Sequence, residues 1–175
     1  MYKAANEGTA RLYWQEAAVP SIGLRPFTVY GPGRDQGVTA GPTQAMLAAA
    51  RGEPHHIAFG GRTELHYAPD VARAFIAASR RPPQGAAVYD MPGRSVHMCE
   101  VVAAIEAAAP EAAGTITFDD VQLPFPPELP GERFAAPVIP LADGVRETIE
   151  LFRRAASPGS SVSRTSAPAT KEVET

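Results

Sequence analysis

Residues 24–34 read LRPFTVYGPGR, and the fold is interpreted outward from this stretch. Its first two residues end the apolar run 21–25, SIGLR, which predicts a short buried strand. The prolines and glycines that follow predict a rigid loop. Upstream, residues 3–18 contain no proline and predict a helix that Val19 and Pro20 end. Helix, strand and rigid loop in this order indicate an α/β protein.

The rest of the chain continues this alternation. Pro42 before the run 44–51 and Gly52 after it predict a helix with a proline start and a glycine end. Further helices are predicted at 69–80, 98–109 and 143–154, and further strands at 88–91 and 116–118. Six prolines between Leu123 and Pro140 exclude a long helix there and predict an extended loop that faces a partner.

Composition excludes several classes of protein. The chain has 175 residues, 16 basic and 19 acidic side chains and a net charge of −3, so no overall positive field favours nucleic acid. Its single cysteine excludes a disulfide framework and a cysteine zinc site, which makes a reducing cytoplasm the expected location. No window reaches the roughly 18–20 apolar residues that span a bilayer, so membrane attachment is not expected.

Three segments together resemble one known family. Residues 2–7, YKAANE, combined with 24–34, are similar to the extended short-chain dehydrogenase/reductase family, the NAD-dependent epimerase/dehydratases. Residues 67–72, YAPDVA, resemble that family's Tyr-Val-Asp-Asp-Val-Ala segment. Residues 88–108 and the closing helix follow the same pattern. We therefore expect a C-terminal portion of the family's domain at 1–155, and a disordered tail at 156–175, where Ser, Thr, Pro, Lys and Glu dominate.

The resemblance implies an α/β fold made of the C-terminal part of a Rossmann-like NAD(P)-binding fold and a small substrate-binding lobe. The N-terminal nucleotide-binding half is expected to be missing. In the family a catalytic tyrosine stands four residues before the lysine, and Tyr2 is adjacent to Lys3 instead. The 15 glycines form no G-x-x-G-x-x-G run, which the family uses to hold pyrophosphate.

The cofactor contacts are carried over residue by residue. By resemblance, Lys3 hydrogen-bonds the nicotinamide ribose and assists the catalytic tyrosine. Pro26, Phe27 and Val29 would form the wall under the nicotinamide. Read without the family, Lys3 is a solvated charge near a terminus, and Pro26 braces the exit from a strand.

Three residues are expected to contact substrate. Thr28 stands where many sugar-nucleotide epimerases carry an asparagine that meets the diphosphate, and threonine lacks the amide fork. Arg34 follows the Gly31-Pro32-Gly33 turn and is suited to an anionic or hydroxylated substrate. Thr63 occupies the position of the family's phosphate-binding arginine. The adjacent Arg62 is expected to take over the phosphate contact. For Arg34 an exposed structural position is equally compatible, and for Arg62 a plain surface position is the preferred interpretation.

The resulting functional expectation is an NAD-dependent sugar-nucleotide epimerase/dehydratase, similar to UDP-glucose 4-epimerase, with NADP as an alternative cofactor. The substrate would be a nucleotide-sugar or related small molecule, and the partner a second copy or a complementing N-terminal half. The chain alone is expected to be inactive. The alternatives are a non-catalytic interaction module, an NAD(P)-dependent reductase of the same family, or a longer reading frame in which Met1 is internal.

Two smaller motifs receive plain interpretations. Adjacent His55 and His56 point to opposite faces of a strand, and no carboxylate or cysteine lies at ligand spacing, so no metal site is expected. His97 and Glu100 are expected to start a helix. Cys99, in the first turn of that helix, is expected to be inert because no base accompanies it.

Overall fold

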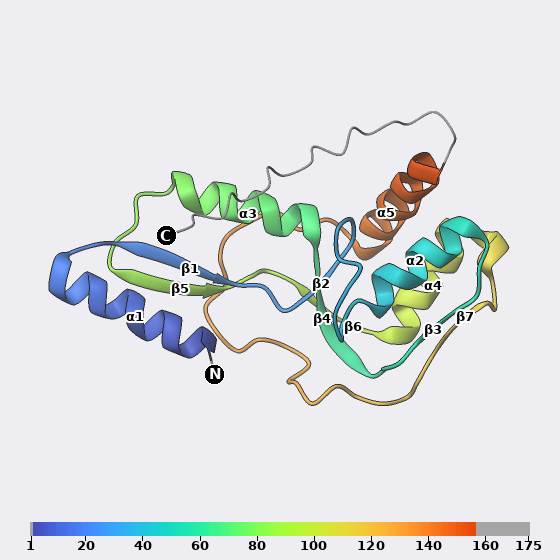
Figure 1. Ribbon diagram of the computed structural model, residues 1–175, viewed down its shortest axis with the longest axis horizontal. Coiled ribbons are helices and arrows are strands. Elements are labelled where there is room, and N and C mark those ends of the chain that lie inside the picture. The colour runs from blue at the N-terminus through green and yellow to red at the C-terminus, as the bar shows by residue number, and fades with distance from the viewer. Residues whose placement is uncertain (1, 157–175) are drawn as a thin grey trace, which may run out of the picture.

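The computed structural model describes residues 2–156, so the tail predicted for 156–175 lies outside them except for its first residue. Ala156 still belongs to the last helix, so the predicted tail does not begin at that residue. In chain order the elements are α1 Tyr2–Ala17, β1 Ser21–Arg25, β2 Thr28–Tyr30, α2 Gly41–Arg51, β3 His55–Ile57, β4 Arg62–Tyr67, α3 Ala68–Arg80, β5 Ala86–Asp90, β6 Arg94–His97, α4 Met98–Ala108, the 3₁₀ helix η1 Pro110–Ala112, β7 Ile116–Phe118 and α5 Leu141–Ala156 (Figure 1).

The strands form three small sheets instead of the edge of one large sheet. β1 pairs with β5 in parallel, β2-β4-β6 forms a mixed three-stranded sheet, and β3 pairs with β7 in parallel. The strand expected at 21–25 is thus present as β1 in the parallel β1-β5 pair. Pro26 and Phe27 separate β1 from β2, and the chain changes sheet at this point.

The main hydrophobic core lies at one end of the molecule. α2, α4 and α5 pack on one another there, beside the β2-β4-β6 sheet and the β3-β7 pair (Figure 1). Met46, Ile57, Val101, Ile105 and Ile149 are fully buried in this core. Since core side chains supply most of the apolar burial, this part of the chain carries most of the folding free energy.

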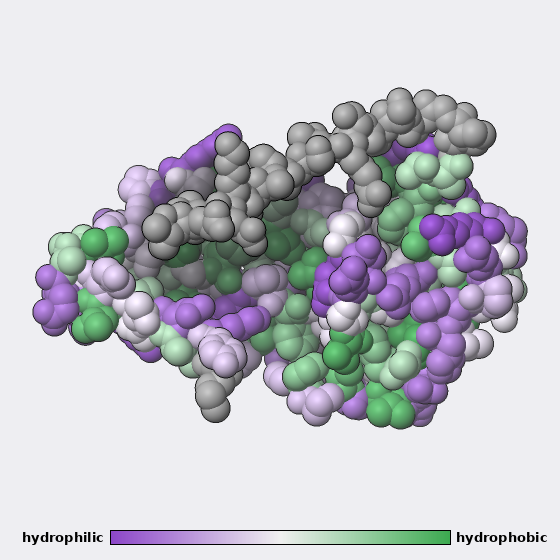
Figure 2. Space-filling model, in the orientation of Figure 1, coloured by the Kyte–Doolittle hydropathy of each residue, from purple (hydrophilic) through white to green (hydrophobic). Residues whose placement is uncertain are grey.

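The other end of the molecule has much less buried surface. α1 and α3 lie on opposite sides of the β1-β5 pair (Figure 1). α3 buries Ala74 and Ala78 in a second, smaller cluster, whereas α1 has no buried residue. Figure 2 shows hydrophobic residues on the surface at this end, where Leu12 and Val19 are exposed.

The predicted helices and three predicted strands are present, with bounds shifted by a few residues at most. α2 ends at Gly52 in the left-handed conformation, with φ of 69°, as the proline-start and glycine-end pattern indicates. β2, β4 and β6 were not predicted. Phe75 of α3 is 48% exposed, although it lies at helical spacing from Val71 and Ala78.

The proline-rich segment 123–140 contains no helix and packs on its own chain. Phe134 is buried in the smaller core cluster, and Gly131 donates its backbone N–H to Asp90 Oδ2 at 2.6 Å. The expectation that this segment faces a partner is therefore corrected for residues 131–134. Within residues 2–156, no helix combines the length and apolar character that crossing a membrane requires.

Candidate functional site

A cleft of about 330 Å³ lies between α1 and the β1-β5 pair. Its floor is apolar and comes from the strands, with Ile22, Leu24 and Val88 among the lining residues. Its polar groups come from α1 and from the end of β1, namely Lys3, Asn6, Glu7 and Arg25. An apolar floor with a few polar groups at the rim is typical of a small-molecule site.

Helical spacing places the polar groups of α1 on one face. Asn6, Glu7 and Ala10 lie three, four and seven residues after Lys3, and all four residues line the cleft together. No described residue forms a hydrogen bond or ion pair with Lys3, so its ammonium is available to a ligand. The sequence identified Lys3 but missed Asn6 and Glu7, although the period of the helix already placed them beside it.

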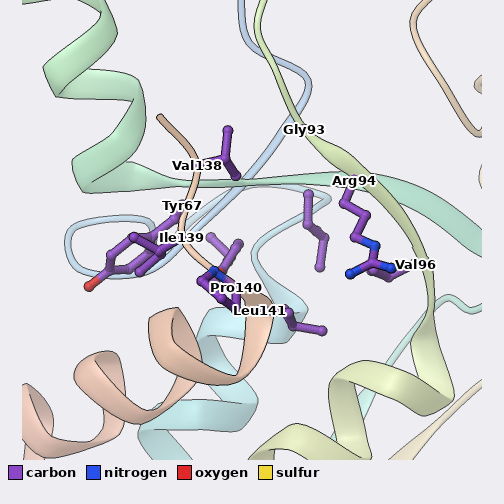
Figure 3. Close-up of a pocket in the computed structure, with 10 residues that line it drawn as sticks. Tyr67, Gly93, Arg94, Val96, Val138, Ile139, Pro140 and Leu141 are labelled. Carbon is purple, nitrogen blue, oxygen red and sulfur yellow. The ribbon is translucent and has the colours of Figure 1, made fainter. Parts of the chain in front are cut away.

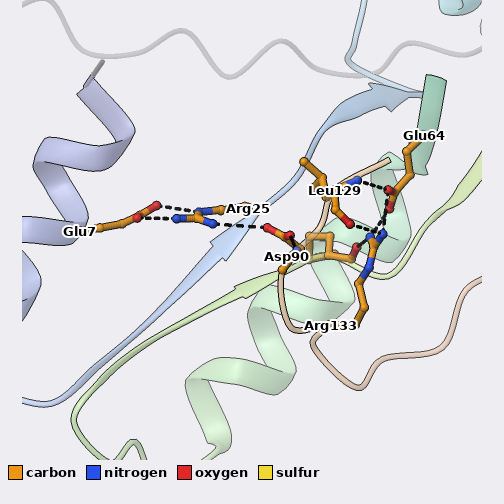
Figure 4. Close-up of polar contacts among 8 residues, drawn as sticks. Glu7, Arg25, Glu64, Asp90, Leu129 and Arg133 are labelled. Atoms are coloured by element: carbon orange, nitrogen blue, oxygen red, sulfur yellow. Dashed lines mark hydrogen bonds and ion pairs between the residues drawn. The ribbon is translucent and has the colours of Figure 1, made fainter. Parts of the chain in front are cut away.

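A chain of charged contacts links α1 to the ends of β1 and β5 (Figure 4). Arg25 donates from Nε and Nη2 to the two oxygens of Glu7, at 2.7 and 2.5 Å. These hydrogen bonds lower the pKa of Glu7 and raise that of Arg25. On its other side Arg25 lies 3.7 Å from Asp90 Oδ1, a buried oxygen that accepts no hydrogen bond within the described part of the chain.

Two of the predicted cofactor residues meet in this cleft and two do not. Lys3 and Pro26 both line it. Phe27 donates its backbone N–H to Nδ1 of His66 at 3.0 Å, and its ring packs edge-on against Phe125. Val29 lies in β2, paired with His66 of β4. The wall expected from residues 26–29 is therefore divided between the cleft and the neighbouring sheet.

The contact between Phe27 and His66 fixes the state of a buried imidazole. Because Nδ1 accepts the Phe27 N–H, the proton lies on Nε2 and is donated to Glu64 Oε1 at 3.0 Å. Burial lowers the pKa of His66, which agrees with a neutral ring. His66 and Glu64 were not singled out by the sequence, and their only signal was the alternation of polar and apolar residues in 64–67.

Glu64 is a fully buried carboxylate held by the proline-rich segment. Arg133 donates to both of its oxygens, and the Leu129 N–H donates to Oε2 at 3.0 Å (Figure 4). Burial alone raises the pKa of Glu64, but the bonds from Arg133, Leu129 and His66 outweigh it and the pKa is lowered. This network fastens residues 129–133 onto β4.

The two threonines at the expected phosphate positions bind each other. Thr28 Oγ1 lies 3.1 Å from Thr63 Oγ1, and both residues are buried. The structure therefore brings together the two positions that the resemblance assigns to substrate phosphate. One of the two hydroxyls donates to the other, and neither residue lines the cleft at Lys3.

The two predicted substrate arginines are engaged by other groups of the chain. Arg34 donates to the Gln36 carbonyl and, at 3.0 Å, to Thr39 Oγ1. Arg62 donates to the Ser95 carbonyl at 2.9 Å and lies 3.8 Å from Glu100. Neither arginine lines the cleft at Lys3.

The remaining motifs also find local partners. His56 contacts Thr117 Oγ1 and Asp119 Oδ1 through its two ring nitrogens. His97 and Glu100 form the capping box of α4, as the sequence predicts. The expectation that no base accompanies Cys99 is wrong, because Nδ1 of His97 lies 3.1 Å from its sulfur.

Comparison with known proteins finds one family whose model matches the sequence, and solved structures with a similar fold. The model of the NAD dependent epimerase/dehydratase family matches residues 1–91. A search of curated proteins finds no match. The family match includes every residue that lines the cleft described above, from Lys3 of α1 to Val88 of β5.

Solved structures share the fold over most of the chain. UDP-glucose 4-epimerase from Thermotoga maritima, with UDP-glucose, superimposes with a TM-score of 0.67 at 20% identity over 89% of this chain and 53% of its own. UDP-glucuronic acid 4-epimerase from Bacillus cereus, in complex with NAD, gives a TM-score of 0.64 at 19% identity over 89% and 52%. A partial consensus L-threonine 3-dehydrogenase gives 0.70 at 20% identity over 87% and 55%. The chain thus spans about half the length of these relatives.

The comparisons correct two expectations drawn from the sequence. The chain was expected to be only the C-terminal half of the family's domain, matched over 1–155, with the nucleotide-binding half missing. The family match instead begins at residue 1 and occupies the N-terminal half of the chain, 1–91. What the comparisons support is an α/β chain related to this family and to about half of each solved relative.

Proposed function

The chain belongs to the NAD dependent epimerase/dehydratase family, and we propose that it supplies one wall of the nicotinamide site of an enzyme acting on a sugar nucleotide or related polyol. The observation that carries this proposal is the meeting of Lys3 and Pro26 in one cleft. Both were expected to contact cofactor, and they are 23 positions apart in the sequence.

The residues of the cleft fit part of a nicotinamide nucleotide. Its apolar floor suits one face of a flat ring, and the free Lys3 ammonium can donate to ribose hydroxyls. The Asn6 amide offers a donor and an acceptor beside it. Glu7 is engaged by Arg25, which holds the rim of the cleft in place. When bound, a nicotinamide cofactor accepts a hydride and returns it.

We further propose that the chain alone binds the cofactor weakly and is inactive. The sequence contains no G-x-x-G-x-x-G run to hold the pyrophosphate, so the contacts available here are those of the nicotinamide end. A complementing chain or second copy would supply the remaining contacts. UDP-glucose 4-epimerase and L-threonine 3-dehydrogenase both resemble this fold, so epimerisation, dehydration and reduction are all compatible with the proposal.

Amide-shift mapping by NMR tests the assignment of the cleft. The 175-residue chain is titrated with NAD to millimolar concentrations. We expect shifts at Asn6, Gly23 and their neighbours, and a loss of affinity of about threefold or more in Lys3→Met, because one charged hydrogen bond is removed. Arg11→Met, which removes another cation of α1 outside the cleft, is the matched control. Shifts confined to other parts of the chain, or equal effects of the two variants, would refute the proposal.

An interaction module is the second candidate, favoured by the exposed side chains of α1. Leu12 and Tyr13 are 55% and 60% exposed on a helix that buries nothing. Size-exclusion chromatography separates the two functions. A module adapted to act alone should elute as one clean species, whereas an incomplete enzyme should self-associate or need a second chain.

A further inference from the structure

A second cleft, of about 350 Å³, lies between the β4-β6 strands and the start of α5 (Figure 3). It shares no lining residue with the cleft at Lys3. Aromatic and branched side chains form most of its surface, including Tyr30, Leu65, Tyr67, Val96 and Val138. Its volume is at the lower end of the roughly 300–1,000 Å³ that ligand sites occupy, which suits a molecule of one or two fused rings.

The walls of this cleft are held in place by main-chain contacts. The Ile139 N–H donates to Asp70 Oδ2 at 3.1 Å, which fixes the strap 138–140 against the start of α3. Asp143 and Gly144 donate their N–H groups to the Pro140 carbonyl, which fixes the same strap to α5. Because both ends of the strap are fastened, the cleft exists without a ligand to shape it.

Arg94 is the one positively charged side chain that lines the cleft. It lies on β6 opposite Leu65, and no described residue accepts a hydrogen bond from its guanidinium or forms an ion pair with it. Neighbouring cations are engaged, since Arg133 binds Glu64 and Arg73 binds Asp70. In Figure 3 the Arg94 side chain extends along the cleft at the opposite end from Tyr67.

The acidic groups near the tyrosine end already have partners. Glu147 Oε2 accepts the Tyr67 hydroxyl at 3.1 Å, and Asp70 accepts from both Arg73 and Ile139. No carboxylate lines the cleft itself, so the one charged side chain among its lining residues is the Arg94 guanidinium. A single guanidinium at the rim of an apolar surface is complementary to one carboxylate on an apolar body.

We propose that this cleft binds a small aryl carboxylate, with its ring between Tyr67 and Val138 and its carboxylate on Arg94. The ring replaces water on the apolar walls, and the carboxylate accepts two hydrogen bonds from the guanidinium. The site is separate from the cofactor cleft, so its test does not depend on the function proposed above.

A paired titration of the full 175-residue chain tests the site. The probes are 2-naphthoate and its neutral analogue 2-naphthamide, followed by NMR shifts of Val96 and Val138. We expect the carboxylate to bind about three to ten times more tightly than the amide, the range for one partly exposed charge contact. Arg94→Gln should reduce this ratio to about one, and Arg80→Gln, at the exposed end of α3, should leave it unchanged. Val138→Trp should weaken both probes, because it fills the cleft from its exposed side.

Three results would overturn the proposal. They are equal affinities for the two probes in the unaltered chain, an unchanged ratio in Arg94→Gln, and the absence of saturable binding of either probe up to its solubility limit. Circular dichroism of each variant establishes that the fold is retained, so that a lost preference reports on Arg94 and not on unfolding.

Discussion

The two ends of the molecule differ in how they are stabilised. The α2-α4-α5 end has a continuous core of fully buried side chains, and the polar groups of its β2-β4-β6 sheet are bonded to one another. The α1 end has a two-stranded parallel sheet with half-buried strands and a helix that buries no residue. Parallel sheets are normally covered on both faces. The difference indicates that the first end folds by its own contacts, whereas the second presents surface and free polar groups for binding.

Truncating one apolar side chain at each end should give the largest difference between the two ends in the change of unfolding free energy. Ile149→Ala removes a fully buried side chain from the main core and should lower the unfolding free energy by about 2–5 kcal/mol. Leu12→Ala removes an exposed side chain from α1 and should change it by less than about 0.5 kcal/mol. Urea denaturation measures both. Comparable losses for the two variants would show that α1 contributes to the same core.

Replacing a glycine with alanine should change the stability in opposite directions at the two ends. A Cβ at Gly93 would lie 2.2 Å from His66 Nε2 and 2.5 Å from Glu64 Oε1, so Gly93→Ala should destabilise by about 1–3 kcal/mol. A Cβ at Gly8 meets nothing within 4 Å, and Gly8→Ala should stabilise α1 by about 0.5–1 kcal/mol. Thermal unfolding of both variants checks the signs, and a neutral Gly93→Ala would mean that the network around His66 is loose.

Acid should weaken the α2-α4-α5 end through His66 and then Glu64. Burial lowers the pKa of His66 from 6.5, so the unfolded chain takes up this proton first and stability falls as the pH drops below about 6.5. The pKa of Glu64 is lowered from 4.5, which continues the loss below that pH. His66→Gln keeps an acceptor and a donor without titrating and should reduce the slope between pH 6.5 and 5. Part of the slope should remain, since burial also lowers the pKa of His55.

The control for this pH dependence is His56→Gln, which alters an exposed histidine bonded to Thr117 and Asp119. We expect it to reduce the slope less than His66→Gln does, because the His56 side chain is exposed whereas that of His66 is buried. If both variants reduce the slope equally, the dependence is a general charge effect and His66 has no special part in it.

Much of the secondary structure could be predicted from the sequence because its signals are local. The proline and glycine around residues 42–52 determine where α2 begins and ends, and His97 with Glu100 determine the start of α4. β4 could not be recognised in this way. Its polar residues Glu64 and His66 are buried, and the arginine that makes this tolerable, Arg133, is 69 residues away from Glu64. The sequence shows that Glu64 is charged but does not show that Arg133 neutralises this charge in the folded chain.

The same limit applies to the candidate sites. Lys3 could be identified because it belongs to a motif that resembles a family, and Asn6 and Glu7 follow from helical spacing. The cleft at Arg94 has no such signal, since its walls come from β2, β4, β6 and the strap before α5. The cleft exists only because the proline-rich segment packs at this position. Hydrogen bonds to Asp70 and to the start of α5 hold the segment there.

Calorimetric titration of the purified 175-residue chain with NAD tests most directly whether the α1 end is one wall of a cofactor site. The account predicts no saturable heat in the micromolar range, because the cleft offers contacts only to the nicotinamide end and the sequence has no glycine-rich pyrophosphate loop. A micromolar dissociation constant would contradict it and would show that this chain holds the cofactor by itself.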